Sequence, residues 1–332
     1  MTNIKDLKVN LENKILSTEN VIIVPHKFAD FDAIGSAIGL SLLPRKLKHQ
    51  AFIVNGDSPT EMEAGVKVIT EEAGKEYGIV SKEKLIASNP NGFDQSLFVL
   101  TDVNKDYLIH VKDLITDPEK TVILDHHEED QKTVPSNHKY IDTSSSSASE
   151  TVTKLLSACK IKIPSDVAKY LLAGIYLDTN KLTKNVSSET MKTVAKLLES
   201  GASMPDVINL FKEDFYSDRR VQELVGKIKM FNYSLAVLVG NDEDEFSREE
   251  LAKAADYALK YGCDGVFAVG NVGNGTVSVS ARSNAVINVG GIMQEMGGGG
   301  NQYSAATKIE GITPTEVGEQ LQKILKPKYY VN

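Results

Sequence analysis

Short apolar runs, alternating with helical patterns, most strongly limit the folds open to this chain. In its first half they cover residues 21–24, 51–54, 97–100, 121–124 and 139–141, and several contain no polar side chain. Strands buried on both faces have this composition, whereas strands with one solvent face alternate apolar and polar residues. The first half therefore predicts an α/β domain whose parallel sheet is covered by flanking helices.

The rest of the chain changes pattern twice, which suggests a second domain. Helical periodicity dominates from Ala148 to about Ile228, with a polar segment at Glu213–Arg220. Strand-like patterns then return at residues 233–240, 265–272 and 276–282, before a glycine run and a terminal helical pattern. Since 332 residues are many for one core, we expect two domains. We assign them as residues 1–205 and a smaller α/β domain at 225–332, joined by a helical linker at 206–224.

Charge and cysteine content exclude several classes of protein. A net charge of −8 argues against a protein that coats duplex nucleic acid, which needs many phosphate contacts from basic residues. Cys159 and Cys263 have no paired spacing, so we expect neither a disulfide nor a zinc–thiolate site. The amino terminus is polar and amphipathic, and no apolar run is long enough to span a membrane. We therefore expect a cytoplasmic protein.

Acidic and imidazole side chains follow four separate element ends. Carboxyl ends of parallel strands meet at one edge of a sheet, so such side chains can converge there. Capping a helix is the competing interpretation for Asp30 or Asp32. Gly35 permits close approach to the amino terminus of the helix that follows these acids. His49, His110 and His138 do not lie in these acid- and imidazole-rich segments, and we expect them on the surface without such partners. The converging residues are His26, Asp30 and Asp32 after the first run, Asp102 after the third, Asp125, His126 and His127 after the fourth, and Asp178 at the end of an apolar helical pattern.

Crowded carboxylates in one cleft would repel one another strongly. Two divalent cations, typically about 3.5 to 4 Å apart in such sites, would remove that repulsion, activate a bridging water and neutralise a phosphoryl group in transfer. Mixed carboxylate and imidazole ligands suit manganese or iron better than calcium. The sequence thus predicts a two-metal site for phosphoryl chemistry.

The four motifs, in this order, resemble the DHH phosphoesterase superfamily with its DHH-associated second domain, over nearly the whole chain. The resemblance implies a catalytic first domain, a substrate-binding second domain, manganese as the usual metal, and a homodimer. It also implies that Asp125 orients an imidazole and that His127 faces the scissile phosphate. The implied ligands are His26, Asp30 and Asp102 for one metal, and Asp32, Asp102, His126 and Asp178 for the other.

Candidate substrate contacts lie in the second domain, at Arg282, Ser283, Gly298, Gly299, Gly300 and Asn301. Backbone amides of a glycine-rich loop can bind phosphate, and arginine can grip it through its planar fork. A flexible turn and a surface arginine are the simpler alternatives. The segments HKFADFDAIGSAIG, RSNAVINV and MQEMGGGG resemble the catalytic portion of GdpP-type cyclic-di-AMP phosphodiesterases rather than RecJ-type exonucleases. Asn301 stands where that family usually has histidine, and it cannot take a proton near neutral pH.

The resemblance implies hydrolysis of cyclic-di-AMP to pApA, AMP or both by metal-activated water. One alternative is a phosphodiesterase for pApA and short oligoribonucleotides (nanoRNA). A second is a nucleotide-binding protein that has lost catalysis, suggested by Asn301. The membrane helices and sensory domain of full-length GdpP-type proteins are absent from this sequence, so we expect a stand-alone form or a fragment.

Overall fold

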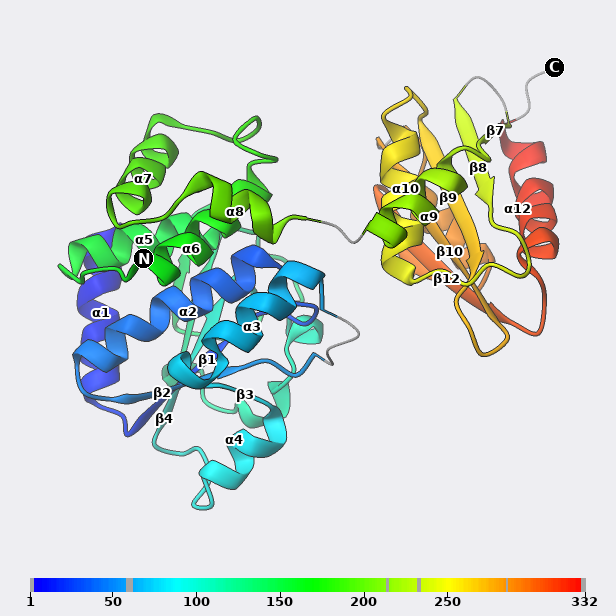
Figure 1. The fold of residues 1–332 in the computed structure, drawn as a ribbon. Helices are drawn as coiled ribbons and strands as arrows, with labels where there is room; N and C mark the ends of the chain where they lie inside the picture. The colour runs from blue at the N-terminus through cyan, green and yellow to red at the C-terminus, as the bar shows by residue number, and fades with distance from the viewer. Residues whose placement is uncertain (1–2, 58–61, 213–214, 232–233, 285, 330–332) are drawn as a thin grey trace. The chain divides into compact units, whose positions relative to one another are not determined.

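The computed structural model describes residues 3–57, 62–212, 215–231, 234–284 and 286–329. The chain divides into two compact units, Met1–Lys212 and Glu213–Asn332 (Figure 1). Each unit has its own sheet and its own apolar core. The α/β architecture predicted from the sequence is therefore confirmed.

The first unit is built on a parallel sheet with strand order β3-β2-β1-β4-β5-β6. All five apolar runs of the first half lie in these strands. The unpredicted strand, β3, is too short to leave a sequence pattern. The strands are β1 (Asn20–Val24), β2 (Gln50–Val54), β3 (Ile79–Val80), β4 (Ser96–Thr101), β5 (Thr121–Asp125) and β6 (His138–Ile141).

The strand order reverses between β1 and β4. The chain adds β2 and β3 on one side of β1, and then returns to place β4 on its other side. Open α/β sheets bind ligands at such a switch point, because the loops after the two central strands diverge and leave a crevice. The loops that follow β1, β4 and β5 therefore meet at one edge of the sheet, and these loops carry most of the predicted ligands.

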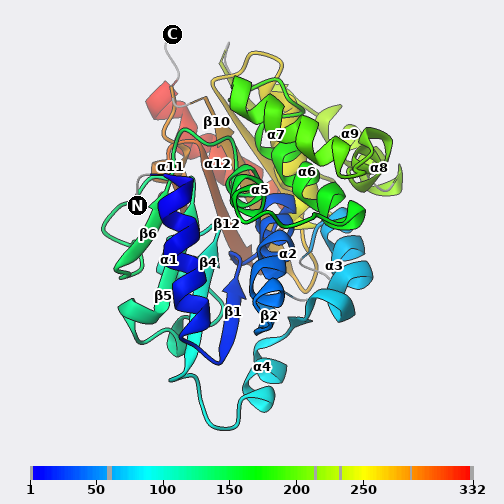
Figure 2. The same ribbon diagram turned by 90° about the vertical axis from the view of Figure 1, so that its left-hand side faces the viewer.

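Figure 2 shows helices packed beside this sheet. Buried apolar side chains form one cluster on each of its faces. In β1, Val21 and Ile23 contact the larger core, while Ile22 and Val24 face a second cluster. That second cluster is completed by Leu85 and by residues after β4. The helices are α1 (Ile4–Leu16), α2 (Phe31–Lys46), α3 (Ala64–Tyr77), α4 (Lys82–Ser88), α5 (Ala148–Ala158), α6 (Ser165–Asp178), α7 (Ser188–Glu199) and α8 (Met204–Leu210), with single 3₁₀ turns at Asp106–Leu108, Lys112–Leu114 and Pro118–Lys120.

Two glycines allow α2 and α6 to pack closely beside the sheet edge. A Cβ atom at Gly35 would lie 2.5 Å from the carbonyl oxygen of Tyr170. At Gly174 it would lie 2.6 Å from Oδ1 of Asp32. Contacts this short are forbidden to any larger side chain. The glycines thus bring the end of α6, which carries Asp178, to the start of α2.

The second unit has a mixed sheet with strand order β11-β12-β10-β9-β8-β7, in which only the β8 and β9 pair is parallel among the described strands. Helices α10 and α12 flank it from opposite faces (Figure 1). Its elements are β7 (Lys229–Met230), β8 (Leu235–Val239), β9 (Gly265–Asn271), β10 (Thr276–Ser283), β11 (Gly299–Gly300), β12 (Ser304–Glu310), α9 (Phe215–Val225), α10 (Arg248–Leu259), α11 (Val289–Glu295) and α12 (Pro314–Tyr329).

The segment predicted as a linker, residues 206–224, contains parts of two helices. Val207 and Leu210 of α8 are buried in the core of the first unit. Val221 and Leu224 of α9 are buried in the second unit. Glu213, in the predicted polar connection, and Tyr233, in a predicted strand, lie outside the described residues. None of the described helices is long and apolar enough to cross a membrane.

Candidate metal centre

The loop between β1 and α2 places His26 and Asp30 beside each other. Nδ1 of His26 lies 2.7 Å from the carbonyl oxygen of Lys27. Because a carbonyl only accepts, Nδ1 carries the proton and Nε2 is left to bind a metal. Oδ1 of Asp30 caps α2 by accepting from the N–H groups of Asp32 and Ala33, at 2.9 and 3.0 Å. Its Oδ2 lies 3.7 Å from Nε2 of His26, so capping and ligation use different oxygens of one carboxylate.

Asp102 follows β4 and lies between two imidazoles. Its Oδ2 is 3.5 Å from Nε2 of His26, and its Oδ1 is 3.4 Å from Nε2 of His126. The residue is buried and has φ of 57°, in the left-handed region that residues other than glycine rarely adopt. Strained backbone of this kind concentrates at functional sites. The two oxygens of one carboxylate thus face two separate ligand groups.

Asp32, His126 and Asp178 form the group on the other side of Asp102. Nε2 of His126 lies 3.2 Å from Oδ2 of Asp178. Asp32 is fully buried, and its oxygens accept from the backbone N–H groups of Ala148 and Ser149, at 2.7 and 2.8 Å. These N–H groups begin α5, where the helix dipole favours a negative charge. A helix terminus therefore fixes the carboxylate that faces the metal ligands.

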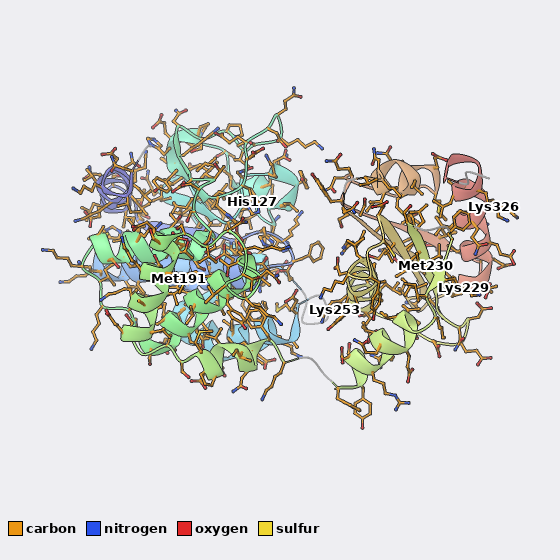
Figure 3. All side chains as sticks on the ribbon, turned by 90° about the horizontal axis from the view of Figure 1, so that it is seen from above. His127, Met191, Lys229, Met230, Lys253 and Lys326 are labelled. Carbon is orange, nitrogen blue, oxygen red and sulfur yellow. The ribbon has the colours of Figure 1, made fainter. Side chains whose placement is uncertain are left out.

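Asp125, at the end of β5, holds His127 through one oxygen of its carboxylate. Its Oδ1 accepts from the backbone N–H groups of His126 and His127, at 2.8 and 3.2 Å, and lies 2.9 Å from Nδ1 of His127. The side chain of His127 is 58% exposed, and its place in the first unit is labelled in Figure 3. Asn104 supports the turn by donating to the carbonyl of His127 at 3.0 Å. The arrangement leaves Nε2 of His127 available to a ligand.

The residues present fit a pair of cations. Ligand atoms of His26, Asp30 and Asp102 lie within 4.8 Å of one another, as do those of Asp32, His126 and Asp178. A third group at this spacing, Asp102, Asp125, His126 and His127, overlaps both through Asp102 and His126. Oδ1 of Asp102, Oδ2 of Asp125 and Nε2 of His126 are buried and have no hydrogen-bond partner among the described residues. Buried polar atoms are rarely left unpaired, because each costs free energy. Cations in contact with these atoms would remove that cost.

The pKa values express the same crowding. Burial, and after it the nearby Asp178 carboxylate, raise the pKa of Asp32 to about 7. Burial also raises the pKa of Asp102 well above its ordinary value, with Asp32 adding to the rise. Burial alone would lower the pKa of His26 and His126, but the surrounding carboxylates outweigh it and raise them to about 10 and about 11. Protons therefore balance the negative charge when no metal is bound.

The carboxylate of Asp57 was missed by the sequence reasoning. It accepts from the backbone N–H groups of Phe28 and Ala29, at 2.8 and 2.9 Å, and lies 2.7 Å from Nε2 of His110. The expectation that His110 is a surface residue without such a partner is wrong, because this ring pairs with a buried carboxylate. His138 also has a partner, at 2.9 Å from Glu119. Asp57 follows β2, so the strand-end rule applied elsewhere could have found it.

A pocket of about 500 Å³ lies directly at this centre. Metal-ligand candidates form one part of its lining, and side chains from the loops after β1 and β4 form the rest. Its lining includes His26, Asp30, Asp102, Asp125, His127 and Asp178, together with Lys27, Phe28, Asn104, Lys105 and Tyr107.

In the second unit, Arg282 is already engaged. Its Nε lies 3.1 Å from Oδ1 of Asp256, and its Nη1 donates to Ser280 and to the carbonyl of Ala281, at 3.3 and 3.1 Å. The adjacent Ser283 is buried. These contacts occupy Nε and Nη1, and Nη2 has no partner among the described residues, so it is the nitrogen left to contact a phosphate.

Two glycines of the run, Gly298 and Gly300, are packed against β12. Gly299 and Gly300 form β11 against β12. A Cβ atom at Gly298 would lie 2.2 Å from the carbonyl oxygen of Ala306, and Gly300 has φ of 140°. Oδ1 of Asn301 accepts from the N–H groups of Tyr303 and Ser304, at 2.8 and 2.9 Å. Gly300 and Asn301 still line a pocket of about 510 Å³ in this unit.

Comparison with known proteins matches both parts of the chain to families. Residues 20–175 match the DHH family, N-terminal domain, and residues 227–327 match the DHHA1 domain. The chain is 31% identical over 323 residues to the cyclic-di-AMP phosphodiesterase GdpP of Bacillus subtilis, covering 94% of this chain and 48% of that protein. It is 26% identical over 219 residues to the bifunctional oligoribonuclease and PAP phosphatase NrnA of Mycoplasma pneumoniae, covering 64% of this chain and 63% of that protein.

Solved structures share the fold at low identity. An exopolyphosphatase-related protein from Bacteroides fragilis has a TM-score of 0.79 and 17% identity, covering 97% of each chain. The exonuclease RecJ bound to manganese has a TM-score of 0.57 and 13% identity, covering 98% of this chain and 95% of that one. At these identities the likeness shows the fold alone. The chain spans about half the length of the GdpP relative.

Proposed function

The chain belongs to the DHH phosphoesterase family, and from this premise we propose that it is a metal-dependent phosphodiesterase that hydrolyses cyclic-di-AMP to pApA, AMP or both. The observation that carries the proposal is the position of Asp102, whose two oxygens face two histidines that belong to separate ligand groups. The cyclic dinucleotide is suggested by the GdpP relative, which matches nearly the whole of this chain.

In this proposal each residue of the centre has a defined role. His26, Asp30 and Asp102 hold one metal, and Asp32, Asp102, His126 and Asp178 hold the other. Two bound ions, manganese by preference, supply charge neutralisation on the phosphoryl oxygens and lower the pKa of water. The manganese bound by RecJ supports that preference.

His127 is assigned to the phosphate itself. Asp125 holds its Nδ1, so the half-exposed ring keeps a fixed orientation and presents Nε2 to the pocket. When the ring is protonated, Nε2–H would donate to a phosphate oxygen. Asp125 thus acts through His127, as an orienting carboxylate does for an imidazole elsewhere.

The second unit is proposed to contact the rest of the nucleotide. Arg282, Ser283, Gly298, Gly299, Gly300 and Asn301 remain the candidate contacts. Because Asp256 occupies Nε of Arg282, the guanidinium would contact phosphate through Nη2, or through Nε after release of Asp256.

A second candidate is hydrolysis of linear pApA and short oligoribonucleotides. The relative from Mycoplasma pneumoniae, whose name includes oligoribonuclease, supports it. Both candidates use the same metal centre and differ only in the nucleotide that the protein accepts.

The test is a product profile. Purified protein with manganese is incubated with cyclic-di-AMP, cyclic-di-GMP, pApA and a short RNA, and products are separated by chromatography. We expect pApA or AMP from cyclic-di-AMP. Cleavage of linear substrates alone would favour the second candidate, and no cleavage of any substrate would overturn the phosphodiesterase assignment.

A further inference from the structure

Two exposed aromatic rings line the same pocket as the metal-ligand candidates. Phe28 is 58% exposed and Tyr107 is 55% exposed, and both line the pocket together with His26 and Asp102. Single exposed apolar side chains are ordinary on protein surfaces. Two large rings in one pocket beside a charged centre indicate instead a surface that a ligand covers.

The backbone holds Phe28 in a costly conformation. Its φ is 57°, in the left-handed region that an aromatic residue rarely adopts. The carboxylate of Asp57 accepts from the N–H groups of Phe28 and Ala29, at 2.8 and 2.9 Å, and is itself paired with His110 at 2.7 Å. A strained conformation persists when its surroundings over-determine it. The pair of Asp57 and His110 therefore fixes the backbone from which the Phe28 ring projects.

Hydrogen bonds tie the loop carrying Tyr107 to the loop carrying Phe28. The backbone N–H of Lys27 donates to the carbonyl of Leu108 at 2.7 Å. Nζ of Lys27 donates to the carbonyl of Tyr107 at 3.2 Å. The ring of Tyr107 also lies 5.4 Å from Nζ of Lys132, a cation–π contact. The two rings thus project from two loops that are hydrogen-bonded to each other at the pocket.

We propose that Phe28 and Tyr107 form a stacking subsite for a nucleobase beside the metal centre. The inference rests on the proposed function, because it requires a nucleotide substrate. Every base has a π-face, so the subsite accepts any base and contributes affinity rather than base specificity. It would hold the nucleotide next to the reacting phosphate, independently of contacts made by the second unit.

The first test compares substrates with and without a base. Phe28→Ala and Tyr107→Ala are assayed on pApA and on pApA analogues in which one adenine is replaced by an abasic sugar. We expect each variant to lower kcat/KM about tenfold on pApA, and to leave the rate unchanged on the analogue that lacks the stacked base. Phe28→Tyr should retain activity. An equal loss on all these substrates would overturn the proposal.

Tyr261→Ala is the matched control, because it removes a tyrosine that is 70% exposed and is not part of this pocket. It should change neither activity nor selectivity for the base. Thermal melting of each variant checks folding, and little change is expected since both rings are more than half exposed.

A second test does not depend on hydrolysis. Binding of 2-aminopurine riboside 5′-monophosphate is followed by fluorescence, which stacking quenches. The parent protein should quench it, and Phe28→Ala should not. If the parent quenches but cleaves no dinucleotide, the proposed function fails and the subsite stands. If quenching is the same with and without the Phe28 ring, the subsite is overturned whatever the activity.

Discussion

The two units have similar architecture, but they treat buried polar groups differently. Each has a sheet with helices on both faces. Among the residues that the structure describes, buried side-chain atoms without a hydrogen-bond partner all belong to the first unit: Asn10, Asp102, Asn104, Asp125, His126 and Ser149. In the second unit, Glu250 is paired with Arg220, and Arg282 with Asp256. The first unit therefore leaves buried polar atoms for a ligand to satisfy, while these charged residues of the second unit already pair with each other.

Strand direction explains the difference. A parallel sheet brings the carboxyl ends of all its strands to one edge, so His26, Asp102 and His126 converge there from three strands. The second sheet is mostly antiparallel, so the ends of neighbouring strands alternate between its edges. Its charged residues meet in pairs rather than in a cluster.

Replacing Asp102 by asparagine should have the largest effect. Asp102→Asn keeps the shape of the side chain but removes the charge shared by both ligand groups. We expect activity to fall by on the order of 1,000-fold, as for other losses of charge stabilisation at a reacting centre. Bound manganese, measured by elemental analysis, should fall below two ions per chain.

Without metal, the same substitution should not destabilise the protein, because it removes a buried carboxylate repelled by Asp32. Asp256→Asn in the second unit is the control and should leave the manganese content unchanged. A large drop in the metal-free melting temperature of Asp102→Asn would contradict the inference that burial and Asp32 make this charge unfavourable.

The next largest effect is expected at the pair of Asp57 and His110. Asp57→Asn leaves one carboxylate contact weaker and should loosen the loop between His26 and Asp30. Mutation of a residue that orients a metal ligand typically lowers metal affinity by about 10- to 100-fold. We expect a loss of that size in manganese affinity, measured by titration calorimetry, with His110→Gln smaller.

His138→Gln is the matched control, because its partner Glu119 is exposed and lies outside the pocket. It should leave manganese affinity unchanged. If Asp57→Asn lowered stability but not metal affinity, the pair of Asp57 and His110 would be a structural contact only. The two units would then differ less in how they use buried polar groups.

Substitutions at Arg282 and Asp256 test the second unit, where these charged residues pair with each other. Loss of a charge-assisted contact to phosphate costs about 1.5 to 3 kcal/mol, so Arg282→Ala should raise KM at least about tenfold with kcat little changed. Asp256→Asn frees the guanidinium and should lower KM below that of the parent. Steady-state kinetics on the preferred dinucleotide measures both. A rise in KM for Asp256→Asn equal to that for Arg282→Ala would mean that the pair only stabilises the unit.

The sequence could predict the features that depend on local pattern. The five apolar runs of the first unit specified its long strands, and the acids and imidazoles at their ends specified which residues would meet. β3 left no signal, since only Ile79 and Val80 form it. The pairing of Arg282 with Asp256 left none either, because it depends on how α10 packs against β10. The glycine run suggested an open loop, whereas close contact with β12 explains Gly298 and Gly300.

The smallest expected effect concerns two buried glutamates that follow serine caps at the same spacing. Glu150 in α5 and Glu250 in α10 each donate a backbone N–H to the serine three residues before. Burial would raise the pKa of Glu150, but Lys154 and the hydroxyl of Ser146 outweigh it and lower the pKa. A depressed pKa contributes stability above the ordinary glutamate range and loses it as the pH falls through the folded value.

Glu150→Gln should therefore destabilise the first unit by about 1 kcal/mol at pH 7, and the difference from the parent should shrink as the pH falls through the acidic range where Glu150 takes up a proton. Hydrogen exchange of the α5 amides reports the stability of the first unit, and exchange of the α10 amides reports that of the second. Glu250→Gln is the matched control and should alter exchange in α10 while leaving α5 unchanged. If each substitution altered both helices equally, the two units would unfold as one, and their polar groups could not be compared independently.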